Sequence, residues 1–112
     1  MNVGTSSGTA VATVDASAMT ATFAGVFSAS IVAMTVTAPA AFAGTITSGS
    51  GADTVTGSTG DDSITTNNGA DTITAGSGDD TIDAGGSHDT IDAGAGTNGI
   101  TGGAGGDTMT GG

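Results

Sequence analysis

Residues 48–110 repeat a nine-residue pattern seven times, and this repeat limits the possible folds more than any other feature of the chain. Two clear copies are AGSGDDTID at residues 75–83 and GGAGGDTMT at residues 102–110. A fixed short period means that each copy forms one structural step and buries its apolar residue only against neighbouring copies. The sequence therefore predicts a stack of repeats, a solenoid, over residues 48–112.

The composition favours β-strands as the elements of this stack. The chain has 112 residues, enough for one domain, and contains no Leu, Trp, Tyr, Lys, Arg, Glu, Gln or Cys. Most residue types that favour helices are missing, whereas the β-branched residues Thr, Val and Ile are common. We expect an all-β protein with neither a disulfide framework nor a thiolate metal site.

All charge on the chain has one sign. Eleven aspartates and no Lys or Arg give a formal net charge of -11 at pH 7. Such a chain repels nucleic acid and anionic membrane surfaces, so we expect neither as a partner. A cation is the partner that the composition predicts.

Residues 1–47 lack the repeat but alternate small polar with apolar residues, which is typical of strands. We expect strands near residues 9–14, 20–24, 26–32, 34–38 and 44–47. Apolar residues also recur every nine or ten positions, at Val26, Val36, Ile46 and Val55. The sequence therefore predicts degenerate, aspartate-free solenoid rungs over residues 1–47, which cap a regular solenoid over residues 48–112.

A signal peptide or a membrane span is the alternative for the first segment. Residues 16–52 carry no charge, and AFA at residues 41–43 has the small-x-small form of a signal peptidase site. However, no Lys or Arg precedes the apolar part, and Thr and Ser interrupt every apolar run. We therefore favour β-rungs and expect no membrane span.

Two of the nine places carry the same kind of side chain in every copy. The sixth place holds an oxygen donor: Asp53, Asp62, Asp71, Asp80, Asp89, Asn98 and Asp107. The eighth place holds an apolar residue: Val55, Ile64, Ile73, Ile82, Ile91, Ile100 and Met109. Because side chains alternate between the faces of a strand, the eighth places predict an apolar interior, and the seventh and ninth, mostly Thr, predict a solvent face.

The glycine-rich places before each sixth place predict a tight turn. Glycine permits positive φ and close backbone approach, so consecutive carbonyl oxygens can converge on one point. Carboxylate and carbonyl oxygens suit calcium rather than zinc. The candidate calcium ligands are the seven sixth-place residues and the fourth-place glycines Gly51, Gly60, Gly69, Gly78 and Gly105.

The pattern resembles the consensus G-G-x-G-x-D-x-U-x of the RTX (repeats-in-toxin) calcium-binding family. The resemblance implies a right-handed parallel β-roll, a β-solenoid with two nonapeptides per turn, with calcium between stacked turns. Stacked partners are then two copies apart, which pairs Asp53 with Asp71, Asp71 with Asp89, Asp89 with Asp107, Asp62 with Asp80, and Asp80 with Asn98. These pairs predict about five calcium ions.

Three copies depart from the pattern. Asn98 lacks the carboxylate, and Gly99 follows it where Thr is usual, so we expect a weaker site there or one that uses the amide oxygen. Ser87 replaces the fourth-place glycine before Asp89, which weakens the prediction for that loop. TNN at residues 66–68 replaces the usual opening, although Asn tolerates left-handed backbone better than most residues.

Stacking places like charges in columns. Turns stack about 4.8 Å apart. At that spacing two carboxylates repel by about 1–3 kcal/mol for a dielectric between those of water and a protein surface. Calcium between them reverses the sign of the interaction. We therefore expect residues 48–112 to be largely disordered without calcium and to fold on binding it.

No pattern of catalytic residues accompanies the repeat. His88, the only histidine, has no second His, Cys or Glu nearby, so we expect it in an exposed loop. No Ser/His/Asp arrangement is recognisable, and a chain without lysine has no phosphate-binding loop. We expect Asp61 and Asp79 to add local negative potential, and Asp83 and Asp92 to face solvent. The chain is not expected to be an enzyme.

An alanine-, threonine- and valine-rich start followed by these repeats resembles bacterial surface-layer proteins and large adhesins. The resemblance implies a calcium-dependent structural module of a surface layer, an adhesin or a self-assembling filament, outside the cell or on its surface, exported by type I secretion. Residues 111–112 open an eighth copy. We expect the last turn to stack on another copy, as a homo-oligomer or filament, or to continue in a longer chain.

Two other functions stay open. One is a calcium β-roll that aids type I secretion and folding of an enzyme or toxin. The other is ice binding, because T-x-T rows resemble the flat faces of ice-binding β-solenoid proteins. Ser63, Gly99, Asp83 and Asp92 interrupt these rows. The simpler interpretation, which we favour, is that Thr suits an exposed strand.

Overall fold

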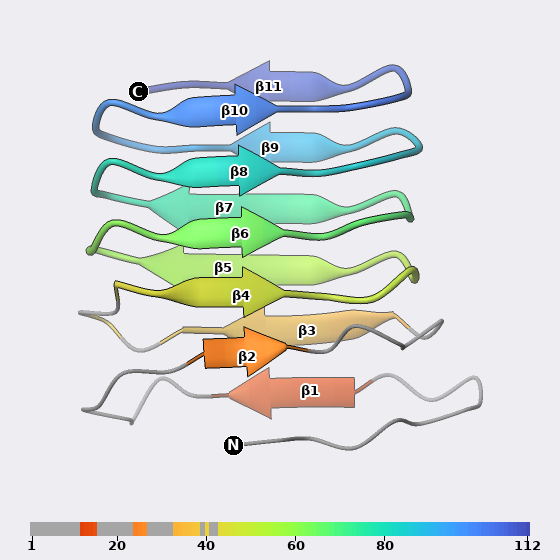
Figure 1. Ribbon diagram of the computed structural model, residues 1–112, viewed down its shortest axis with the longest axis horizontal. Coiled ribbons are helices and arrows are strands. Elements are labelled where there is room, and N and C mark those ends of the chain that lie inside the picture. Colours follow the sequence, from red (N-terminus) through yellow and green to blue (C-terminus); the bar gives the residue numbers. More distant parts are fainter. Residues whose placement is uncertain (1–11, 16–23, 27–32, 39, 41–42) are drawn as a thin grey trace.

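The protein is a β-solenoid in the computed structural model, which describes residues 12–15, 24–26, 33–38, 40 and 43–112. Side chains are described from residue 33 onward. Each strand pairs in parallel with the strand one turn away (Figure 1). No helix occurs among these residues, so none of them spans a membrane as a helix. The predicted all-β parallel solenoid is confirmed.

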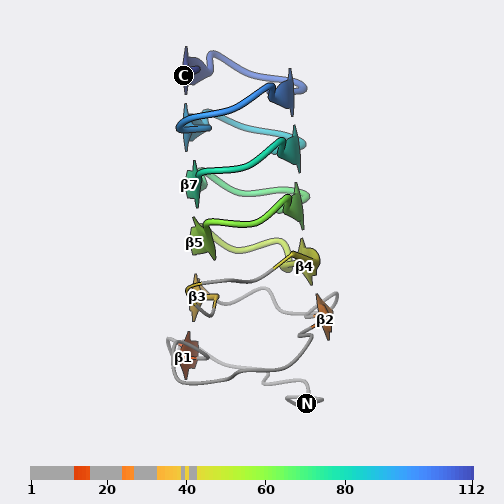
Figure 2. The ribbon, with the colours of Figure 1, turned by 90° about the vertical axis from the view of Figure 1, so that its left-hand side faces the viewer.

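The strands form two sheets that face each other (Figure 2). The first sheet contains, in spatial order, β1 (Ala12–Asp15), β3 (Met34–Thr37), β5 (Thr54–Ser58), β7 (Thr72–Gly76), β9 (Thr90–Asp92) and β11 (Thr108–Thr110). The second sheet contains β2 (Ala24–Val26), β4 (Thr45–Thr47), β6 (Ser63–Thr65), β8 (Thr81–Asp83) and β10 (Gly99–Thr101). Because consecutive strands alternate between the sheets, each turn of the solenoid contains one strand of each.

Stacked strands keep a fixed register through the repeat. Ile91 lies opposite Ile73, a step of 18 residues that equals two nonapeptides. The predicted two nonapeptides per turn are therefore confirmed. The step is longer near the N-terminus, where Met34 lies opposite Ala12, 22 residues away.

The strands expected within residues 1–47 are found in part. To within one residue, β3 and β4 match the strands predicted near 34–38 and 44–47. β1 overlaps the strand predicted near 9–14 at residues 12–14, and residues 9–11 lie outside the described part of the chain. The other two predicted strands overlap β2 only at its ends, and the rest of their residues, 20–23 and 27–32, lie outside the described part of the chain. The register places Gly25, not Val26, opposite Ile46, so the expected apolar spacing is displaced by one residue there.

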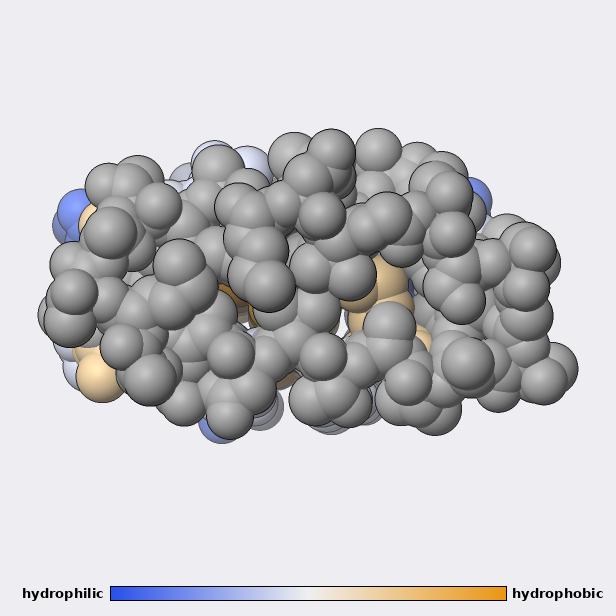
Figure 3. Space-filling model, turned by 90° about the horizontal axis from the view of Figure 1, so that it is seen from below, coloured by the Kyte–Doolittle hydropathy of each residue, from blue (hydrophilic) through white to orange (hydrophobic). Residues whose placement is uncertain are grey.

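The eighth-place side chains form the apolar interior. Five of them are at most 1% exposed: Val55, Ile64, Ile73, Ile82 and Ile91. Val36 and Ile46 continue the column toward the N-terminus, Ile100 packs against it half-buried, and Met109 in the last strand is 53% exposed. Viewed along the stack, hydrophobic residues are visible inside the cross-section, and hydrophilic residues are visible at its border, including both ends (Figure 3). Besides this column, the core contains Met34 and Ala38 near the N-terminus and the first-place alanines Ala75, Ala84 and Ala93.

Tight turns at both edges join the strands, and their backbone conformation follows the repeat. From Thr66 onward, the second and fourth places of every copy have positive φ, as at Gly76 (115°) and Gly78 (123°). A Cβ atom added at Gly76 would collide with the carbonyl oxygen of Ser58 in the neighbouring turn. Glycine is favoured at such a place because it has both the required φ and no side chain.

Candidate metal centre

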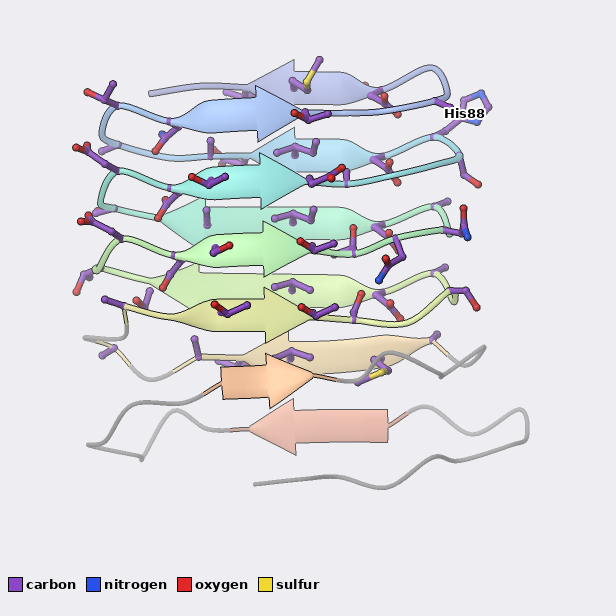
Figure 4. All side chains as sticks on the ribbon, in the orientation of Figure 1. His88 is labelled. Atoms are coloured by element: carbon purple, nitrogen blue, oxygen red, sulfur yellow. The ribbon has the colours of Figure 1, made fainter. Side chains whose placement is uncertain are left out.

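The turns gather the sixth-place side chains into one column along each edge of the solenoid. The turns that lead into the first sheet carry Asp53, Asp71, Asp89 and Asp107, and those that lead into the second sheet carry Asp62, Asp80 and Asn98. Figure 4 shows oxygen-bearing side chains repeated at the turns along both edges. The grouping follows from the 18-residue step, which returns every second copy to the same edge.

Hydrogen bonds join each predicted sixth-place pair across neighbouring turns. The backbone N–H of the earlier residue donates to Oδ1 of the later one over 2.8–3.0 Å in all five pairs: Asp53 to Asp71, Asp71 to Asp89, Asp89 to Asp107, Asp62 to Asp80, and Asp80 to Asn98. The N–H of Met34 donates to Asp53 in the same way over 2.9 Å. One oxygen of each later side chain is therefore occupied by the backbone of the turn before it.

The second oxygen of the buried carboxylates has no hydrogen-bond partner within the described part of the chain. These oxygens are Oδ2 of Asp53, Asp71, Asp80 and Asp89 and Oδ1 of Asp62. Their residues are only 1–2% exposed. Burying a charged oxygen without a partner costs on the order of several kcal/mol. A bound cation or protonation of the carboxylate would remove this cost.

Burial alters the acidity of two of these carboxyls. Desolvation raises the pKa of Asp71, against the effect of the N–H donated by Asp53, and the neighbouring carboxylates of the column raise it further. Desolvation likewise raises the pKa of Asp62, against hydrogen bonds from Ser58. Both shifts have the direction expected for an acid that is buried without a counter-charge.

The donor set fits calcium. It consists of oxygens alone, which hard cations prefer. Among the described residues, no three His, Cys, Asp or Glu side chains converge on one point, so backbone oxygens must supply much of any coordination shell. The predicted fourth-place glycines provide carbonyls beside the carboxylate columns: the carbonyl oxygen of Gly51 lies against the α-carbon of Gly69, and that of Gly60 against the α-carbon of Gly78.

Hydroxyl groups at the turns form contacts that the sequence did not predict. The N–H and the hydroxyl of Ser58 both donate to Oδ2 of Asp62, over 2.9 and 3.3 Å. The buried hydroxyls of Ser48 and Thr66 donate to carbonyl oxygens one turn later, over 3.2 and 3.1 Å. The sequence signal was a hydroxyl residue at a place where most copies have Gly or Ala. This is the first place for Ser48 and Thr66 and the second place for Ser58.

The fifth-place residues lie outside the carboxylate columns. His88 is exposed and projects from the edge of the solenoid (Figure 4). Asp61 and Asp79 are also exposed, and Oδ1 of Asp61 accepts the backbone N–H of Asp79 over 2.8 Å. Asp83 and Asp92 are exposed at strand ends, as predicted.

The comparison with protein families agrees with this geometry. The sequence model described as RTX calcium-binding nonapeptide repeat (4 copies) matches residues 47–82, 65–100 and 83–112. No curated protein and no solved structure matches the chain. The matched residues make up more than half of the chain and contain both carboxylate columns. The chain therefore belongs to the RTX calcium-binding nonapeptide repeat family.

Proposed function

We propose that this chain is a structural module that acts outside the cell, in a surface layer, an adhesin or a self-assembling filament, and that folds when it binds calcium. The observation that carries the proposal is the set of five buried carboxylate oxygens without a partner in the described residues. Each destabilises the metal-free fold, and a cation beside it removes that penalty. The regular repetition of these oxygens along a stack suits a structural role.

The ions are proposed to lie in the turns at the two edges, one beside each unpartnered oxygen, which gives about five per chain. Calcium supplies positive charge and takes about six to eight oxygen ligands. The proposed ligands are the sixth-place carboxylates and the fourth-place carbonyls of Gly51, Gly60, Gly69, Gly78 and Gly105. The carboxylates repel one another, and a bound calcium ion offsets this repulsion. Calcium affinity and folding are therefore coupled.

Residues 1–47 are proposed to cap the regular solenoid as degenerate rungs. Their described strands support this role, because β1 and β3 pair within the first sheet, and β2 and β4 within the second. β3 and β4 in turn pair with β5 and β6 of the repeat. A cap of this kind covers the backbone groups that the first regular turn would otherwise leave unpaired.

Circular dichroism with sedimentation, in calcium and in chelator, tests the proposal. We expect strand signal in calcium and its loss in chelator, and equal signal in both would contradict folding on calcium. Asp71→Asn should raise the calcium concentration needed for folding. Asp92→Asn is the matched control, because it also removes one carboxylate but from an exposed strand end. Large particles in calcium would favour the filament over a β-roll that aids secretion of an attached enzyme or toxin.

Ice binding is the second candidate, and the distribution of threonines between the sheets favours it. Along β5, β7, β9 and β11 of the first sheet, the seventh and ninth places are all exposed, and all are Thr except Asp92. The other three interruptions, Ser63, Asp83 and Gly99, lie on the second sheet. The hydroxyls of the first sheet thus form a lattice, with repeats of about 4.8 Å between strands and about 6.6 Å along them.

Thermal hysteresis of the calcium-loaded protein tests this candidate. Asp92→Thr completes the lattice on the first sheet and should increase the hysteresis. Asp83→Thr makes the same substitution at the same place on the second sheet and should leave it unchanged. Absence of hysteresis in a folded, calcium-loaded sample would exclude ice binding while leaving the structural proposal intact.

A further inference from the structure

The side chain of Asn98 makes a set of contacts different from those of the aspartates in its column. Its Oδ1 accepts the N–H of Asp80 over 2.9 Å. This bond is the same as in the other four pairs, in which the later side chain accepts the backbone N–H of the earlier residue. Its Nδ2 donates to the carbonyl oxygens of Ala93 and Gly94, over 3.3 and 3.2 Å. These carbonyls belong to the first and second places of the same copy, so the amide group closes its own turn.

The orientation of this amide is fixed by its partners. The Asp80 N–H can only donate, so the atom that faces it is the amide oxygen. The NH₂ group must then face the two carbonyl oxygens, which can only accept. All three hydrogen bonds are therefore satisfied in one orientation and would be lost in the flipped one.

An aspartate in the same position presents an oxygen where Asn98 presents its NH₂ group. In the turns of Asp53, Asp71, Asp80 and Asp89, the second oxygen, Oδ2, is buried and has no hydrogen-bond partner in the described part of the chain. A carboxylate oxygen cannot donate to the carbonyls of the first and second places, so a cation is needed to bridge them. The amide of Asn98 supplies positively polarised hydrogens at that point.

We propose that the Asn98 amide substitutes for a calcium ion, so that this turn is closed without metal. The proposal rests on calcium binding by the other turns, as set out above. An ion entering here would have to break two hydrogen bonds and would find no carboxylate at the sixth place of the turn. The Asn98 turn therefore adds nothing to the number of ions bound.

Calcium stoichiometry of the full chain, measured by equilibrium dialysis and by calorimetry, tests this inference. Asn98→Asp replaces the NH₂ group with an oxygen and should bind one more ion per chain than the natural sequence. Asn68→Asp is the matched control, since it adds the same charge at an exposed third place and should leave the number unchanged. Circular dichroism in saturating calcium verifies that each variant is folded.

The outcomes separate this inference from the proposed function. If the natural chain binds no calcium, the proposed function fails and this inference with it. If the natural chain binds calcium but Asn98→Asp gains no ion, or does not fold in saturating calcium, only the role of Asn98 is overturned. A gain of one ion by Asn98→Asp and none by Asn68→Asp supports it.

Discussion

Backbone strain is concentrated at Ser87. Among the described residues, Asn67 and Ser87 have positive φ without being glycine, at 68° and 106°. Asn67 lies in the left-handed region that Asn tolerates, whereas a φ of 106° is outside the regions that residues with a Cβ commonly adopt. The repeat imposes this conformation at its fourth place, so Ser87 adopts it although it is not glycine.

Ser87→Gly should stabilise the calcium-loaded protein by about 1 kcal/mol, because it removes strain of about 1–3 kcal/mol but adds entropy to the unfolded chain. Urea unfolding in saturating calcium measures the change. Asn67→Gly is the control: it removes the 2.8 Å hydrogen bond from Asn67 Nδ2 to the carbonyl of Ser48, so it should give no gain. A loss of stability in Ser87→Gly would contradict the strain argument.

The raised pKa values of Asp62 and Asp71 predict how pH acts on the metal-free chain. A folded-state pKa above the unfolded value of about 3.9 means that the folded state binds more protons between the two values, so its stability falls as pH rises through that window. In chelator, lowering the pH from 7 toward 4 should therefore increase strand signal. In calcium, the same acidification should release ions, because protons compete for the carboxylates.

Circular dichroism across this pH range, with and without chelator, measures both trends. Asp71→Asn should weaken the acid-induced gain in chelator, because it removes one of the buried groups that titrate. Asp92→Asn, which alters an exposed carboxylate, should leave the gain unchanged. Strand signal in chelator that falls on acidification would contradict the assignment of burial as the cause.

The elements of the repeat could be predicted from the sequence because the period fixes strand, turn and register together. The pairing of Asp71 with Asp89 follows from the step of 18 residues alone. Near the N-terminus the step lengthens, and no local pattern specifies which residue of β2 faces Ile46. The hydroxyl contact of Thr66 could not be predicted either, because it depends on the packing of one turn against the next. The contact of Ser58 with Asp62 lies within one copy but depends on the exact course of that turn.

The apolar column sets the stability of the stacked strands. Ile82 is 1% exposed in the middle of the stack, whereas Met109 in β11 is 53% exposed. Ile82→Ala should destabilise the calcium-loaded protein by about 2–5 kcal/mol, the range for a buried aliphatic residue that leaves a cavity. Met109→Ala should cost clearly less, since Met109 stays 53% exposed and its truncation leaves no enclosed cavity. Urea unfolding in saturating calcium compares them, and equal losses would contradict the dependence of stability on burial in the column.

On the scale of the whole molecule, strand stacking and charge repulsion oppose each other, because the chain has a net charge of -11. The sheets bring the carboxylates into two columns, while like-charge repulsion favours an expanded chain. Hydrogen bonds from Asp53 to Asp71 and onward link every turn to the next, so ions bound in one turn stabilise its neighbours. Folding on calcium should therefore be cooperative along the stack.

Small-angle scattering during a calcium titration measures this transition directly. The folded chain has a radius of gyration of 12.7 Å. An unfolded chain of this length has one of about 34 Å, and self-repulsion expands it further. We expect a steep change between these values as calcium rises, and no comparable change with magnesium, which holds its water more firmly and demands a stricter geometry. A compact chain in chelator at neutral pH would show that the stack stands without its ions, and that the unpartnered carboxylates are tolerated in some other way.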